Sequence, residues 1–317
     1  MTKPPRFIPS TISPEARAFI RDAAVPEPRV ISETTIGVIR EANAAAYAPA
    51  AEAMREAHLD RVEDEEIAGV RVQVSTPKTY DQTRDDRAVL YFFGGSYVEG
   101  SPTEDLAATA RLAQSLGLKF YAPYYRLAPE HPFPAALDDA VAVYQALAER
   151  FAPGRLAVVG ESAGGNLAVV TLLRARDEGL AMPCALALMS PWADLTLRSE
   201  SLHTHRGLDP TFAADGEDVS EAEAYGGGRD LTEPLISPVY AEDWTEFPPT
   251  LITTGTRDLL MSDCARLSTV MRRAGVEVSL HLWEGMWHVF EYYPEIPESG
   301  QSLEEIAHFL VGHLECA

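Results

Sequence analysis

A serine stands between glycines in residues 160–165, which read Gly-Glu-Ser-Ala-Gly-Gly. The apolar residues 156–159 come directly before, so the expected order is a strand, a tight turn and then a helix. In such a turn a side chain two positions before or after Ser162 would collide with neighbouring backbone, which explains a glycine at both places. The pattern predicts that Ser162 presents its hydroxyl above a sheet edge as a nucleophile for acyl transfer.

This motif is weak by itself, since Gly-x-Ser-x-Gly arises by chance in roughly one chain in ten of this length. Acyl transfer of this kind also needs a carboxylate and then a histidine, each just past the end of a later strand. Asp258 follows a strand-like run at Thr250–Gly255, and His288 follows one at Val278–Trp283. We expect Asp258 to orient His288, and His288 to take the proton of Ser162. The alternatives are a helix N-cap for Asp258 and a half-buried loop histidine for His288.

Four longer segments carry a resemblance to a known family. Residues 125–139 read Tyr-Arg-Leu-Ala-Pro-Glu-His-Pro-Phe-Pro-Ala-Ala-Leu-Asp-Asp, and residues 190–196, 234–238 and 284–288 are similarly distinctive. With the serine, aspartate and histidine, they resemble the bacterial hormone-sensitive-lipase-like carboxylesterases of the α/β-hydrolase fold. The resemblance runs from about residue 87 to the C-terminus and implies a carboxylesterase-type serine hydrolase.

One loop departs from the family, which has His-Gly-Gly-Gly where residues 93–96 read Phe-Gly-Gly-Ser. The resemblance assigns the oxyanion hole to the backbone N–H groups of Gly95, Ser96 and Ala163, and these donors survive a change of side chain. Phe93 can only pack where a histidine can brace the loop by hydrogen bonding. A side chain at Ser96 disfavours positive φ. Whether the loop forms a weakened or a reshaped oxyanion hole stays open.

Several residues near the motifs are candidates for the walls of a substrate pocket. Tyr97, Trp192, Met286 and Trp287 lie close to motif residues and are the candidates for substrate binding, with core packing as the alternative. Glu161 is expected to brace the neighbouring loop and to have no part in proton transfer.

Strand-like runs alternate with helical patterns from about residue 89 onward. The expected strands are residues 89–93, 119–124, 156–159, 185–189, 251–254 and 278–283, and the expected helices are residues 106–116, 135–151, 166–178 and 264–274. This alternation predicts the α/β class, with a mainly parallel central sheet and helices on both faces. The resemblance narrows it to the α/β-hydrolase fold with a helical cap.

Two segments break the alternation and are expected to form that cap. They are residues 1–66, with helical spacing through residues 42–59, and an acidic insertion at residues 197–234. The α/β-hydrolase core then comprises residues 67–196 and residues 235–317. The alternative for both cap segments is surface decoration.

Composition limits the partners. A hydrophobic content of 46% over 317 residues allows one large domain, and the net charge of −22 repels nucleic acid and anionic membranes. Without a membrane-length apolar run or a signal-peptide core, we expect a cytoplasmic protein that does not insert into membranes. Cys184, Cys264 and Cys316 are too scattered for disulfides or a zinc site. No metal or organic cofactor is implied, because no ligand cluster or phosphate-binding glycine loop occurs.

These observations predict a serine hydrolase that cleaves carboxylic esters with short to medium acyl chains through an acyl-enzyme on Ser162. Its partner is a small-molecule ester, and a homodimer stays open as the oligomeric state. The alternatives are a lactone or amide hydrolase, or a non-catalytic ligand-binding protein on the same fold. The altered loop at residues 93–96 favours the binding protein, whereas the filled serine, aspartate and histidine positions favour the enzyme.

Overall fold

A single mixed sheet forms the centre of the computed structural model, which describes residues 7–24, 26, 30–212 and 219–314. Within that part of the chain its strand order is β1-β2-β4-β3-β5-β6-β7-β8, and only β2 runs antiparallel to its neighbours β1 and β4. The strands are β1 (Leu59–Ile67), β2 (Val70–Pro77), β3 (Ala88–Phe92), β4 (Lys119–Pro123), β5 (Leu156–Glu161), β6 (Ala185–Met189), β7 (Thr250–Gly255) and β8 (Val278–Trp283). Residues 213–218 of the expected cap insertion, and Cys316, lie outside the described residues.

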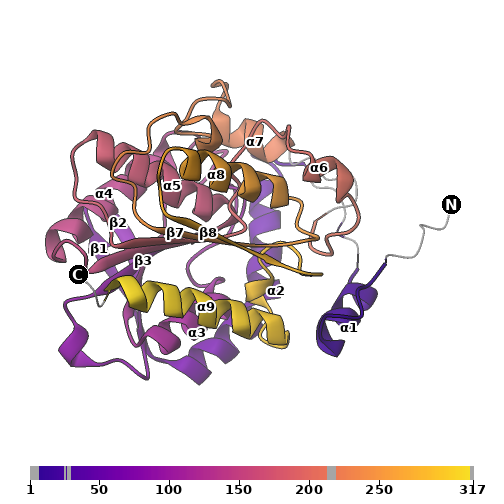
Figure 1. The fold of residues 1–317 in the computed structure, drawn as a ribbon, viewed down its shortest axis with the longest axis horizontal. Coiled ribbons are helices and arrows are strands. Elements are labelled where there is room, and N and C mark those ends of the chain that lie inside the picture. The colour runs from indigo at the N-terminus through magenta and orange to yellow at the C-terminus, as the bar shows by residue number, and fades with distance from the viewer. Residues whose placement is uncertain (1–6, 25, 27–29, 213–218, 315–317) are drawn as a thin grey trace.

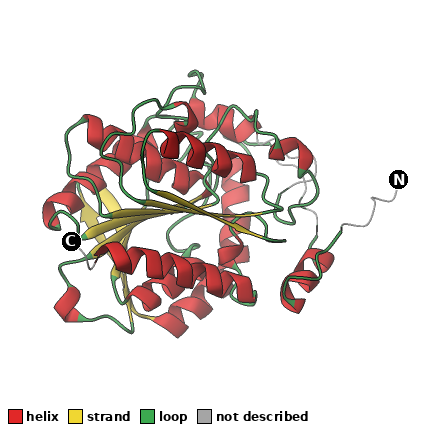
Figure 2. Cartoon of the chain, viewed as in Figure 1, coloured by secondary structure: helices red, strands yellow, loops and turns green. Residues whose placement is uncertain are grey.

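Helices cover both faces of this sheet, which Figure 1 and Figure 2 show nearly edge-on. In that view α4, α5 and α8 lie above the sheet, and α3 and α9 lie below it. The helices are α1 (Pro14–Asp22), α2 (Ile36–His58), α3 (Leu106–Leu116), α4 (Ala135–Arg150), α5 (Ser162–Asp177), α6 (Ser201–Thr204), α7 (Val219–Gly226), α8 (Met261–Arg273) and α9 (Pro297–Leu314). The predicted α/β class with a mainly parallel sheet is confirmed. No helix of the described chain combines the length and apolarity needed to cross a bilayer.

The central strands are mostly apolar and buried along their whole length because both of their faces are covered. Every residue of β3, β5, β6 and β7 is buried. Their parallel pairing brings all their carboxyl ends to one edge of the sheet. The turns that follow β5, β7 and β8 therefore meet there, although they lie far apart in sequence.

The two strands β1 and β2 were not expected from the sequence. Residues 59–66, which the sequence analysis placed in the N-terminal cap segment, belong to β1 and pair with β2. The run Leu-Asp-Arg-Val-Glu-Asp-Glu-Glu-Ile is mostly charged, because β1 is an edge strand with most of its side chains exposed. Charged side chains on an edge strand discourage pairing with other chains, and here they also hide the strand pattern.

Helix α1 lies to one side of the molecule in Figure 1 and is attached by a small apolar cluster of its own. Ile12, Ala16 and Ile20 pack there with Met286 and Trp287. The hydroxyl and N–H of Ser13, the N-cap of α1, donate to the Glu298 carboxylate at 2.8 and 2.7 Å. The N-terminal segment is thus fixed to the loop that follows β8 and to the start of α9.

Candidate active site

Strand β5 ends at Glu161 and helix α5 begins at Ser162 without an intervening loop. Ser162 has a φ of 52°, in the left-handed region that residues other than glycine rarely adopt. A Cβ atom on Gly160 would lie 2.4 Å from the Gly164 carbonyl oxygen, and one on Gly164 would lie 2.1 Å from the Phe92 carbonyl oxygen. Because no side chain fits at either glycine, this pair allows the strand to turn directly into the helix.

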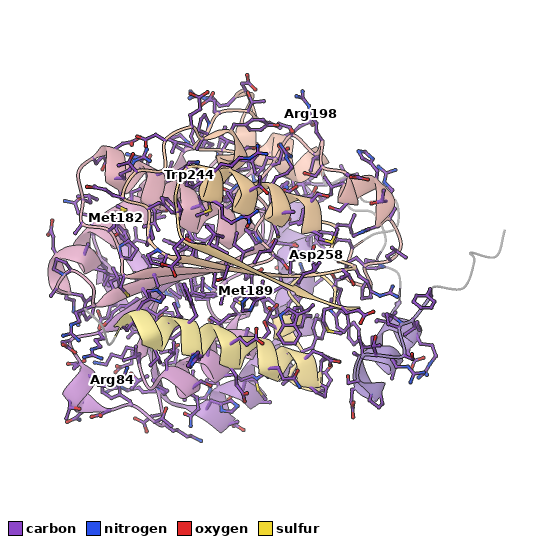
Figure 3. All side chains as sticks on the ribbon, in the orientation of Figure 1. Arg84, Met182, Met189, Arg198, Trp244 and Asp258 are labelled. Carbon is purple, nitrogen blue, oxygen red and sulfur yellow. The ribbon has the colours of Figure 1, made fainter. Side chains whose placement is uncertain are left out.

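The structure brings Ser162, His288 and Asp258 together in one line of hydrogen-bonding contacts. His288 Nε2 lies 3.0 Å from Ser162 Oγ, and His288 Nδ1 lies 3.1 Å from Asp258 Oδ1. Asp258, labelled in Figure 3, also accepts from the Thr254 hydroxyl at 2.7 Å and the Leu260 N–H at 2.8 Å. Both carboxylate oxygens are therefore held in place, which fixes the orientation of the imidazole.

The electrostatics of this pair suit a base. Burial lowers the pKa of His288, but the charge of Asp258, followed by Asp209 and Glu161, raises it, and the net pKa lies above the ordinary 6.5. Burial raises the pKa of Asp258, but the charge and hydrogen bond of His288 outweigh it, so its net pKa is lowered. Asp258 therefore remains ionised over the range in which His288 takes up a proton.

The loop at residues 93–96 is braced in a way that its sequence does not indicate. The Phe93 ring stacks on Tyr125 with 4.1 Å between ring centres, and the Tyr125 hydroxyl donates to the Phe93 carbonyl at 2.7 Å. Gly95 has a φ of 100° and Ser96 a φ of 53°, so the loop turns through two left-handed residues. Tyr125 thus supplies the hydrogen bond that Phe93 lacks.

Glu161 lies against the same loop at Gly94. A Cβ on Gly94 would lie 2.0 Å from Glu161 Oε1, and the Gly94 N–H donates to the carboxyl groups of Glu161 and Asp105. Tyr91 donates its hydroxyl to Asp105 at 2.7 Å. Burial raises the pKa of Asp105 to about 7, and burial together with Asp105 raises the pKa of Glu161. The pair therefore retains a proton at a pH where an isolated carboxyl is ionised.

A small pocket opens beside Ser162. Ser96 lies at its wall, so the nucleophile and the unusual loop face the same space. The remaining lining is apolar and comprises Trp192, Leu197, Leu202, Phe212, Leu259 and Leu260. Three of these side chains come from the insertion at residues 197–234, for which the sequence offered no residue-level signal.

Of the four expected substrate-binding residues, Trp192 lines this pocket and the other three pack elsewhere. Tyr97 is fully buried, stacks on Tyr225 with 3.6 Å between ring centres, and donates to Asn166 at 2.6 Å. Met286 and Trp287 are fully buried against α1. These three side chains are packed in the core, which is the alternative that the sequence left open for them.

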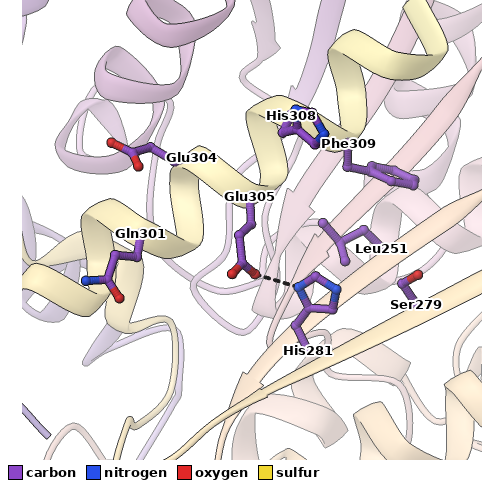
Figure 4. A pocket seen from close by; sticks show the side chains of 8 residues that line it. All are labelled: Leu251, Ser279, His281, Gln301, Glu304, Glu305, His308 and Phe309. Carbon is purple, nitrogen blue, oxygen red and sulfur yellow. Dashed lines mark hydrogen bonds and ion pairs between the residues drawn. The ribbon is translucent and has the colours of Figure 1, made fainter.

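A larger and more open hollow, of about 570 Å³, lies between β8 and α9, and Figure 4 shows the side chains that line it. His281 of β8 and Glu305 of α9 form its polar wall, with 2.6 Å between Nδ1 and Oε2. His308 and Phe309 extend the lining along α9. None of the candidate site residues is among its described lining residues, so size alone does not identify the functional pocket here.

Comparison with known proteins gives the same picture as this geometry. A family model described as the alpha/beta hydrolase fold matches residues 89–292. An acetyl-hydrolase of Streptomyces hygroscopicus is 39% identical over 72% of this chain and 76% of its own. An esterase of Acinetobacter venetianus is 32% identical over 77% of this chain and 79% of its own.

A solved structure leads to the same group. An esterase described as belonging to the bacterial hormone-sensitive lipase family is 33% identical and superimposes with a TM-score of 0.77, covering 89% of this chain and 97% of its own. The match to the family model extends over most of the chain, and the relatives are enzymes. The chain therefore belongs to the α/β-hydrolase fold family and, within it, to the hormone-sensitive-lipase group of esterases.

Proposed function

We propose that this esterase cleaves carboxylic esters through an acyl-enzyme on Ser162, with His288 as the base and Asp258 as the group that orients it. The observation that carries the proposal is the unbroken contact from Asp258 Oδ1 through the imidazole to Ser162 Oγ, at 3.1 and 3.0 Å. A serine hydroxyl becomes a nucleophile at neutral pH only when an adjacent base accepts its proton.

In the proposed mechanism His288 carries the proton between Ser162, the leaving alcohol and water. His288 Nδ1–H donates to Asp258, and the Ser162 hydroxyl passes its proton to Nε2 while Oγ bonds to the ester carbonyl carbon. Collapse of the tetrahedral intermediate breaks the bond to the alcohol, which leaves with the proton from Nε2. Water then repeats the sequence on the acyl-enzyme, returning the acid and the free Ser162 hydroxyl.

The oxyanion of each intermediate is assigned to the N–H groups of Gly95, Ser96 and Ala163. Ala163 lies in the first turn of α5, where N–H groups have no partner within the helix. The left-handed φ angles of Gly95 and Ser96 support a sharp turn beside Ser162, of the kind that exposes successive N–H groups. The brace from Tyr125 to the Phe93 carbonyl supports a hole that is reshaped and still firm.

The proposed substrates are neutral esters with short to medium acyl chains. The pocket beside Ser162 is small, and much smaller than the hollow between β8 and α9, which favours a small acyl group. Its walls are mainly leucine and aromatic side chains, which suit an apolar acyl group. The relative from Streptomyces hygroscopicus is named an acetyl-hydrolase, which supports placing the shortest acyl chains among the substrates.

Replacing Ser162 by alanine tests the proposal. We expect ester turnover to fall by at least about ten-thousand-fold, because triad deletions in other serine hydrolases cost this much. Covalent labelling by a fluorophosphonate should disappear. A panel of p-nitrophenyl esters from acetate to decanoate, with lactones and anilides beside it, would measure the chain-length and bond preference of the wild-type protein.

Retention of labelling in Ser162→Ala would show that another residue is the nucleophile. Faster turnover of lactones or anilides than of every ester would reassign the scissile bond. Binding of esters without turnover by the wild-type protein would turn the proposal into a ligand-binding function.

A further inference from the structure

A second carboxylate lies behind the catalytic histidine of the proposed mechanism, on a segment that sequence analysis gave only to the cap. Asp209 is fully buried, and its Oδ2 accepts the backbone N–H of His288 at 2.9 Å. Its Oδ1 accepts both the N–H and the hydroxyl of Thr211, at 2.8 and 2.6 Å. Both oxygens are therefore engaged, one by the cap segment and the other by the loop that carries the imidazole.

The residues around Asp209 contact the same pair of groups. The Phe212 ring lies over the His288 imidazole, with 4.8 Å between ring centres. His205 Nδ1 lies 2.9 Å from the backbone carbonyl oxygen of Asp258. Residues 205–212 thus contact the backbone of the orienting aspartate and both the backbone and the ring of the base.

Among the described residues, three carboxyl groups act on the imidazole. Asp258 faces it from the loop after β7, Glu161 from the end of β5, and Asp209 from the cap segment. Arg257 donates to the backbone carbonyl of Leu208, next to Asp209. Burial and, after it, the charge of Asp258 raise the pKa of Asp209, whereas the charge of His288 lowers it. The net pKa of Asp209 is raised. All three carboxyl groups favour a positive charge on His288.

We propose that Asp209 is a positioning residue for His288. It holds the main chain of the histidine through one hydrogen bond and places a second buried carboxylate behind the imidazolium that forms as Ser162 loses its proton. This inference rests on the proposed function and extends it: the cap insertion is part of the machinery that supports the base, in addition to forming the pocket wall.

The variant Asp209→Asn separates this role from simple packing. Asparagine keeps the size and an oxygen for Thr211, but it removes the charge and turns an amide donor toward the His288 N–H. We expect kcat to fall by about 10- to 100-fold with KM changed less than about threefold, since the acyl pocket is untouched. The acid limb of kcat/KM should move to lower pH by about half a unit or more, because a negative neighbour raises the pKa of an imidazole.

Asp230→Asn is the matched control. Asp230 makes the same turn, accepting the N–H and hydroxyl of Thr232 at 2.9 and 2.8 Å, and it is exposed within the same insertion. Its kcat and acid limb should stay at wild-type values. An acid limb unmoved in Asp209→Asn, or moved equally in Asp230→Asn, would overturn the inference.

A second variant and a second measurement keep the test independent of turnover and of one substitution. Thr211→Val removes one bond to Asp209 but keeps the charge, so its acid limb should not move; a shift as large as that of Asp209→Asn would overturn the role of the charge.

NMR titration of the His288 ring in a Ser162→Ala background reads the same pKa without catalysis. A lower imidazole pKa in Asp209→Asn than in the protein with Asp209 supports the inference even if no ester is hydrolysed. If the two pKa values are equal and the wild-type protein hydrolyses esters normally, the role of Asp209 is refuted while the proposed function stands.

Discussion

At the residue scale, the protonation of His288 decides whether the proposed reaction proceeds. The neutral Nε2 must accept the proton of Ser162, so activity should rise with pH as His288 loses its own proton. Because Asp258 and the neighbouring carboxyls hold the pKa of His288 above 6.5, the midpoint of the acid limb should also lie above 6.5. Measuring kcat/KM for p-nitrophenyl acetate from about pH 5 to about pH 10 gives this midpoint. A flat profile, or a midpoint below 6.5, would contradict the assignment.

Asp258→Asn should remove most activity while leaving the fold intact. An amide at this position favours the wrong imidazole tautomer, and the loss in a comparable triad is about ten-thousand-fold. Asp263→Asn is the comparison, since Asp263 is equally buried but accepts the Asp194 N–H at 2.9 Å instead of facing His288. Asp263→Asn should lower the thermal midpoint clearly while leaving kcat close to the wild-type value. The reverse ranking of the two variants would transfer the orienting role to Asp263.

The loop at residues 93–96 should control which esters fit more than it controls the mechanism. Its backbone donors are present with either side chain, whereas Ser96 forms part of the pocket wall and Phe93 stacks on Tyr125. We expect Ser96→Gly and Phe93→His, singly and together, to change kcat/KM unevenly across short, long and branched acyl esters. If the double variant gained about a hundred-fold or more on every ester alike, the native loop would be a damaged oxyanion hole.

At the scale of elements, the loop after β8 is held from two directions. Its His288 end faces the cap segment at residues 205–212, while Trp287 packs under α1. The Phe19 ring of α1 stacks on Trp287 with 4.3 Å between centres and 6° between planes. Helix α1 therefore restrains the residue directly before the candidate base, although it contributes no group to the site.

Phe19→Ala should weaken this docking. Loss of a half-buried ring that is stacked on another ring is worth about 1–2 kcal/mol, which corresponds to a fall of a few degrees in the thermal midpoint. We expect kcat to fall as well, because the His288 loop becomes less firmly held. Val38→Ala in α2, where the side chain is 70% exposed, is the control and should change stability by less than about 0.5 kcal/mol. Unchanged kcat at a lowered thermal midpoint would limit α1 to a structural role.

At the scale of the whole molecule, the excess of negative charge destabilises the folded state. The chain carries 48 acidic and 26 basic residues, so its net charge of −22 repels itself in the folded state. Salt shortens the range of that repulsion to about 8 Å at physiological ionic strength and to about 3 Å near 1 M. The thermal midpoint at about pH 8 should therefore rise by several degrees between about 10 mM and about 500 mM NaCl.

The same experiment at about pH 5.5 is its control, because partial protonation of carboxylates reduces the net charge and should reduce the salt response. A midpoint that falls with salt at pH 8 would show that attractive ion pairs outweigh the overall repulsion.

Local rules explain which parts of the fold were predictable. Strand β6 and helix α3 have the bounds that the hydrophobic pattern predicts, because their pattern reflects burial of the element itself. Strand β8 also has the predicted bounds, although it is an edge strand with no buried residue, because apolar residues recur along it. Strand β1 was missed because its exposed residues are mostly charged and leave no apolar pattern. Its place in the sheet depends on pairing with β2, which no local pattern in β1 encodes.

The sequence by itself determined the turn at Ser162 and the chain order of serine, aspartate and histidine, since a steric requirement for glycine and a strand ending are both local. Only the tertiary structure decided that Tyr125 braces the altered loop, that Trp287 packs under α1 and not in the pocket, and that Asp209 contacts the His288 backbone. These contacts join segments far apart in the chain. Their partners are set by how layers pack around the sheet, and no spacing within one segment records that packing.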